Sequence, residues 1–172
     1  VIASRSLRIA GDKLNDDIVR YLREEKNLLI GEPSAENLKI TLGSAYPLQE
    51  EIEGRVRGRD LVSGLPKEIT LASEEVREAW QKSTRSIVMA VKDTIEETPP
   101  ELTADLINRH IFLAGGGALL RGLDKAIAHE TKLFVKIVDD PLTAVARGCG
   151  FVLENVEQLK SILVSPDKGS YL

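Results

Sequence analysis

The sequence has almost no cysteine, only a small excess of negative charge and no long apolar run. Cys149 is the one cysteine among 172 residues, which excludes an internal disulfide and fits a reducing compartment. No apolar run approaches the roughly 20 residues of a membrane span, and no signal peptide is recognisable. The net charge of −4 gives no electrostatic attraction to nucleic acid. We therefore expect a soluble cytoplasmic protein with no nucleic-acid partner.

The composition is that of a globular protein, with 42% hydrophobic and 29% charged residues. This length accommodates one domain, or a domain with an inserted subdomain. The opening residues, VIASRSLRIAGD, read as the middle of a strand and lack a methionine. We expect the chain to be a piece of a longer one.

Hydrophobic periodicity predicts alternating strands and helices over most of the chain. The expected strands are residues 1–9, 50–60, 67–72, 110–114 and 133–138, and the expected helices lie within 11–27, 30–43, 73–97, 101–107, 119–130 and 139–154. Ser34, Ser73 and Asp140 are expected to cap three of these helices. From residue 73 onward the alternation predicts an α/β layer with parallel strands, and residues 31–72 resemble an insertion.

The stretch FLAGGGALLRG, residues 112–122, places three glycines between a strand and a helix. A dinucleotide-binding fingerprint requires glycine where Leu120 stands, and a P-loop requires lysine where Leu123 stands, so both motifs fail. Two interpretations remain open. The glycines form a tight turn without a ligand, or a nucleotide lies directly on their backbone.

The surroundings of this stretch carry a family resemblance. IFLAGGGALLRGLD (111–124), followed by DDPLTAVARGCG (139–150), resembles the second half of the bacterial actin homologue MreB, in the actin/Hsp70/sugar-kinase superfamily. The likeness extends through residues 6–43, 63–79 and 98–107. Small residues of the second segment, at 144, 146, 148 and 150, would allow a helix to approach a sheet closely.

The resemblance implies the fold class, which is α/β: the second domain of an actin-like (ribonuclease H-like) ATPase with an inserted small α+β subdomain. Residues 1–30 and 73–164 would form the nucleotide-binding, IIA-like subdomain. Residues 31–72 would form the inserted, IIB-like subdomain, and residues 165–172 a flexible tail.

The resemblance also implies a nucleotide site, in which ATP lies between two domains and this one contributes the adenosine side. The residues expected to line it are Gly115, Gly116, Gly117, Glu36, Lys39, Gly11 and Asp12. Arg121 and Asp124 would support the glycine loop. A plain surface ion pair remains an alternative for Glu36 and Lys39, and an ordinary helix start remains one for Gly11 and Asp12.

Other parts expected of such a site are missing from this sequence. The Asp-x-Gly-Thr phosphate loop of the family does not occur in it, and Mg²⁺ would be held mainly by the other half of the parent protein. The parent would be a slow ATPase, whereas this chain alone should not hydrolyse ATP. His110 and His129 have no ligand pattern around them, so no metal site is expected.

The function implied by the resemblance is cytoskeletal. The parent would polymerise head to tail with ATP, determine rod shape and organise cell-wall synthesis with membrane-anchored cell-shape and wall-synthesis proteins. It would lie in the cytoplasm at the inner face of the membrane, without direct membrane insertion from this chain. The alternatives are a sugar- or acetate-kinase relative, and a partner-binding fragment without nucleotide affinity.

Overall fold

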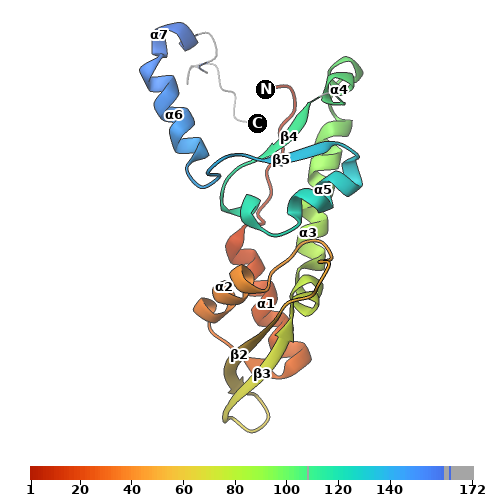
Figure 1. Cartoon of the computed structure of the whole chain (residues 1–172), viewed down its shortest axis with the longest axis vertical. Helices are drawn as coiled ribbons and strands as arrows, with labels where there is room; N and C mark the ends of the chain where they lie inside the picture. The colour runs from red at the N-terminus through yellow and green to blue at the C-terminus, as the bar shows by residue number, and fades with distance from the viewer. Residues whose placement is uncertain (108, 161–162, 164–172) are drawn as a thin grey trace.

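The computed structural model describes residues 1–107, 109–160 and 163 and shows an elongated molecule (Figure 1). A three-stranded sheet with its helices occupies one end and a two-stranded sheet the other. The elements are α1 (Gly11–Lys26), β1 (Leu28–Leu29), α2 (Glu32–Thr41), β2 (Glu53–Asp60), β3 (Pro66–Ala72), α3 (Ser73–Glu96), α4 (Pro100–Leu106), β4 (His110–Leu113), the 3₁₀ turn η1 (Gly116–Leu119), α5 (Leu123–Thr131), β5 (Phe134–Ile137), α6 (Ala144–Glu154) and α7 (Val156–Leu159).

The first sheet is antiparallel, in the order β1-β2-β3. The predicted hairpin is confirmed: β2 and β3 pair with Val56 opposite Ile69. Val56 is buried, whereas Arg55 and Arg57 on the other face are exposed, as the period of two indicated. Sequence reasoning missed β1, because two residues are too few to show a period.

The second sheet confirms the predicted parallel component. β4 and β5 are parallel, with His110 opposite Phe134 and Leu113 opposite Ile137. Helix α5 makes the crossover between the two strands. Ile111, Leu113 and Val135 pack against a small core formed by buried residues of α3 and α5.

The larger core lies in the part of the molecule that contains the hairpin. Its buried residues come from α1, α2, the first sheet, the first half of α3 and the residues directly after β1 and α2. They are Leu14, Ile18, Leu22, Leu28, Ile30, Ala35, Leu38, Leu42, Val56, Leu71, Val76 and Trp80. Trp80 is fully buried and its Nε1 donates to the Leu14 carbonyl at 3.0 Å. Helix α3 contributes to both cores and runs between them. Helix α1 packs in the larger core, together with residues of the expected insertion. The division into a IIA-like subdomain (1–30 and 73–164) and a IIB-like subdomain (31–72) stays a prediction.

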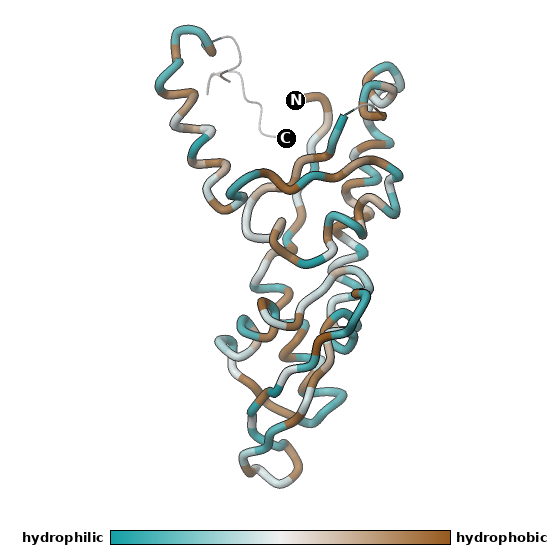
Figure 2. The backbone as a smooth tube through the Cα atoms, viewed as in Figure 1, coloured by the Kyte–Doolittle hydropathy of each residue, from teal (hydrophilic) through white to brown (hydrophobic). Residues whose placement is uncertain are grey.

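Apolar and polar residues are interspersed along the described backbone (Figure 2). Among the described residues, no helix is both long enough and apolar enough to cross a membrane.

Residues 1–9 do not form the predicted strand. A strand needs a neighbouring backbone for its hydrogen bonds, and none of the described strands pairs with this segment. Side chains hold it against α3 instead: Arg5 forms an ion pair of 2.5 Å with Asp93 and a second one with Glu97.

The predicted caps at Ser34 and Ser73 are wrong. Helix α2 begins at Glu32 after Gly31, with proline in its first turn, so Ser34 lies inside the helix. Helix α3 begins at Ser73 itself, whose buried Oγ donates to Glu51 and accepts from the Ile52 amide. The Glu75 carboxylate accepts from the Ala72 amide at 2.9 Å at the same helix end.

Two later helices also begin after their predicted starts. A 3₁₀ turn and an extended residue precede α5, which begins at Leu123 rather than at 119. Helix α6 begins at Ala144, and Asp140 has a positive φ of 48° instead of capping it. None of the α6 residues is buried, and no described atom lies within 4 Å of a Cβ added at Gly148. In the part of the chain that the structure describes, the small residues therefore serve no helix–sheet packing. The predicted tail, 165–172, lies outside the described residues.

Candidate functional site

The three glycines follow β4 at its carboxyl end. Gly115 has a φ of 82°, a conformation that side-chain-bearing residues rarely adopt, and its amide donates to the Pro141 carbonyl at 2.7 Å. Among the described residues, a Cβ added at Gly117 would meet no atom within 4 Å, and one at Gly116 would meet only the Leu142 Cδ2 at 3.5 Å. A tight turn therefore explains Gly115 but does not explain the other two glycines.

A second group of predicted residues meets where α1 begins beside α2. The Lys39 Nζ donates to Glu36 Oε2 at 2.5 Å and to the Gly11 carbonyl at 3.3 Å. The Asn15 Nδ2 donates to the same Glu36 oxygen at 2.8 Å. These hydrogen bonds, that of Lys39 foremost, hold the pKa of the Glu36 carboxyl below its ordinary value. The Lys39 side chain is 14% exposed, so this ion pair is built into the contact between the two helices.

Sequence reasoning missed Asn15, although helical spacing could have found it. Asn15 follows Gly11 by one turn of α1, so the two residues share a face of that helix. Its side chain is buried and its Oδ1 has no hydrogen-bond partner in the structure. Asp12, in contrast, lies exposed in the first turn of α1.

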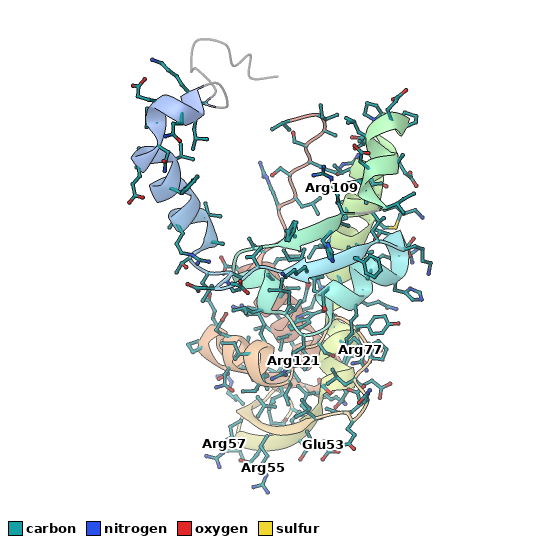
Figure 3. All side chains as sticks on the ribbon, turned by 45° about the horizontal axis from the view of Figure 1, so that its top comes forward. Glu53, Arg55, Arg57, Arg77, Arg109 and Arg121 are labelled. Carbon is teal, nitrogen blue, oxygen red and sulfur yellow. The ribbon has the colours of Figure 1, made fainter. Side chains whose placement is uncertain are left out.

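Arg121 connects the turn formed by Gly115, Gly116 and Gly117, here called the glycine turn, to α2 (Figure 3). Its Nη1 donates to the carbonyl of Thr41, the last residue of α2, at 2.7 Å. Its own carbonyl accepts from the Ala45 amide, also at 2.7 Å. The predicted residues therefore form two groups, one at each side of this connection. Asp124 lies in the first turn of α5.

A cavity of about 920 Å³ lies along α3 and contains none of the predicted residues. Carboxylates and arginines both line it. Burial, together with the Glu78 carboxylate, raises the pKa of Tyr21 at this surface to about 12. The Tyr21 hydroxyl donates to Glu78 at 3.2 Å. In the part of the chain that the structure describes, no three His, Cys, Asp or Glu side chains gather in a group that could hold a metal ion.

The chain is similar to known proteins of one family. Residues 1–161 match the family described as MreB/Mbl protein. The chain is 45% identical over 159 residues to the cell shape-determining protein Mbl of Bacillus cereus, covering 92% of this chain and 48% of that protein. It is 46% identical over 157 residues to the cell shape-determining protein MreB of Escherichia coli, covering 91% and 45%.

A solved structure gives the same result for the fold. The crystal structure of MreB5 of Spiroplasma citri bound to ADP superimposes with a TM-score of 0.87 at 37% identity, over 93% of this chain and 49% of that one. The same protein bound to AMPPNP superimposes with a TM-score of 0.86 at 36% identity, over 95% and 49%. The chain thus spans about half the length of the relatives it matches.

Proposed function

Because the chain belongs to the MreB/Mbl family and has an actin-like α/β fold, we propose that it is the adenosine-binding half of an ATP-dependent, filament-forming protein that determines cell shape. The observation that carries this proposal is the open glycine turn. At Gly116 and Gly117 the backbone carries no side chain, although neither a positive φ nor packing in the described part of the chain requires glycine there. A flat ligand lying on the backbone gives a reason for both residues.

The group around Glu36 supports the same function. Both hydrogen bonds that reach its carboxylate from Lys39 and Asn15 end on Oε2, which leaves Oε1 to accept from a ribose hydroxyl. Lys39 would lie beside the adenine, and Gly11 with Asp12 would lie at the edge of the cleft. The relative MreB5 has been solved with ADP and with AMPPNP, which supports an adenine nucleotide as the ligand.

Polymerisation belongs to the same proposal. A head-to-tail contact that repeats along an axis without closing a ring gives a filament. We assign one such contact to residues 31–72, which carry the hairpin at one end of the molecule (Figure 1). Membrane-anchored cell-shape and wall-synthesis proteins would be its further partners. The phosphate chemistry and the Mg²⁺ would depend mainly on groups outside these 172 residues.

A chimera tests the proposal. In it, this chain replaces the part of Escherichia coli MreB that it matches, so that the complete two-domain protein is restored. We expect the chimera to bind ATP in a calorimetric titration and to pellet as filaments when ATP is added. Failure to bind ATP in a folded chimera would overturn the nucleotide assignment.

The same chimera separates the rival functions. Filaments and rod shape restored without nucleotide affinity would favour a partner-binding protein. ATP-dependent phosphorylation of a sugar or of acetate, without pelleting, would favour the kinase relative.

A further inference from the structure

The two halves of the proposed nucleotide site lie on different cores. The glycine turn follows β4 of the second sheet, whereas Glu36 and Lys39 lie on α2, which packs in the larger core. A nucleotide that touches both halves needs a fixed distance between them. The structure must therefore contain a contact that sets this distance.

The segment Leu120–Gly122 makes that contact. Leu120 packs against both cores. The Arg121 side chain donates to the Thr41 carbonyl, and the Arg121 carbonyl accepts from the Ala45 amide, each at 2.7 Å. At Gly122, with a φ of 75°, an added Cβ would lie 2.8 Å from the Tyr46 Cβ, so the two backbones approach closely.

The hydrogen bond from Arg121 to the Thr41 carbonyl is well placed to set the distance between the two halves of the site. Thr41 is the last residue of α2, where carbonyls lack helical partners and the helix dipole favours a positive charge. The bond joins residues 80 positions apart in the sequence. Its acceptor, Thr41, follows Lys39 by two residues, and its donor, Arg121, follows Gly117 by four residues.

We propose that Arg121 is a positioning residue for the nucleotide: it fixes α2, with Glu36 and Lys39, at the distance from the glycine turn that an adenosine can span. This inference rests on the proposed function. It goes beyond support of the loop alone, because it makes ATP affinity depend on a bond between the two halves of the site. Arg121 itself would not contact the nucleotide.

The test uses Arg121→Ala and Arg121→Lys, with Arg109→Ala as the matched control. Arg109 is also an exposed arginine and lies well away from the connection (Figure 3). Lysine keeps a charged donor for the Thr41 carbonyl, whereas alanine removes it. Three quantities are measured for each variant: the ATP affinity of the chimera, the exchange rate of the Ala45 amide in the nucleotide-free 172-residue chain, and the unfolding midpoint of that chain.

We expect Arg121→Ala to weaken ATP binding about tenfold, as for the loss of one charge-assisted hydrogen bond. The Ala45 amide should exchange about tenfold faster, and the unfolding midpoint should barely change. Arg121→Lys should restore most of both losses, and Arg109→Ala should behave as the wild type.

Two outcomes would overturn the inference, and a third would overturn the proposed function on which it rests. Unchanged ATP affinity in Arg121→Ala would remove the positioning role while leaving the proposed function intact. A loss of affinity matched by a lower unfolding midpoint, without rescue by lysine, would reduce Arg121 to a structural residue. A wild-type chimera that binds no ATP would instead refute the proposed function itself, and the Ala45 exchange rates would still show whether Arg121 holds the two cores together.

Discussion

Gly43 and Gly116 are glycines for opposite reasons, and substituting each of them tests the packing of the core and the position of the nucleotide. A Cβ at Gly43 would lie 2.1 Å from the Trp80 Cη2 and 2.3 Å from the Lys39 carbonyl oxygen. Trp80 cannot retreat, because it is fully buried and its indole nitrogen is hydrogen-bonded. Gly43→Ala should therefore lower the free energy of unfolding by about 3 kcal/mol, at the upper end for overpacking.

Gly116→Val should leave the stability almost unchanged and should instead weaken ATP binding. Within residues 1–107 and 109–160, the one atom near its Cβ position is the Leu142 Cδ2, at an ordinary 3.5 Å. The free energy of unfolding should therefore change by less than about 1 kcal/mol. In the chimera, however, the branched side chain would occupy the space assigned to the nucleotide. ATP affinity should fall by a factor of about 5 to 150, which corresponds to an overlap cost of about 1–3 kcal/mol.

Urea denaturation followed by tryptophan fluorescence measures the first effect, because Trp80 is the only tryptophan in the sequence. Calorimetric titration of the chimera with ATP measures the second. A Gly43→Ala variant as stable as the wild type would refute the close packing against Trp80. Undiminished ATP affinity in Gly116→Val would show that the three glycines are a turn and nothing more.

Three further predictions concern single side chains. Lys39→Ala should weaken ATP binding to the chimera by about 1–2 kcal/mol, and it should also lower the melting temperature, because this mostly covered side chain joins α2 to α1. Trp80→Phe should cost about 1–2 kcal/mol of unfolding free energy, measured by circular dichroism, since a buried hydrogen bond is lost. The Arg77 guanidinium, followed by a serine hydroxyl, holds the pKa of the Glu51 carboxyl below its ordinary value. That contribution to stability is present above about pH 4.3, the value for an unfolded glutamate, and is lost as the pH falls through the lower folded pKa. Glu51→Gln should flatten the acid side of the stability profile, and an unchanged profile would contradict this assignment.

Local patterns in the sequence were sufficient for the helices and strands that bury one continuous face. Leu14, Ile18 and Leu22 recur at helical spacing, and α1 forms there with these residues buried. The alternation around Val56 gave the hairpin in the same way. In each case a single element carries the whole signal, so neighbours need not be known.

The sequence also located the glycine turn and the Glu36–Lys39 pair, because both lie within a few consecutive residues. It could not show that the Lys39 ammonium reaches the Gly11 carbonyl, since that contact depends on how α1 packs on α2. Similarly, the strand expected at residues 1–9 had the right side chains, but strand formation depends on a neighbouring backbone.

The connection through Arg121 shows the difference most clearly. The sequence shows an arginine near the glycine turn, but no local pattern indicates that it bonds to Thr41, which lies 80 residues away. A helix or a hairpin is specified by the period of its own residues. A hydrogen bond between two cores is specified only once both cores have packed, because packing alone brings donor and acceptor within 3 Å of each other.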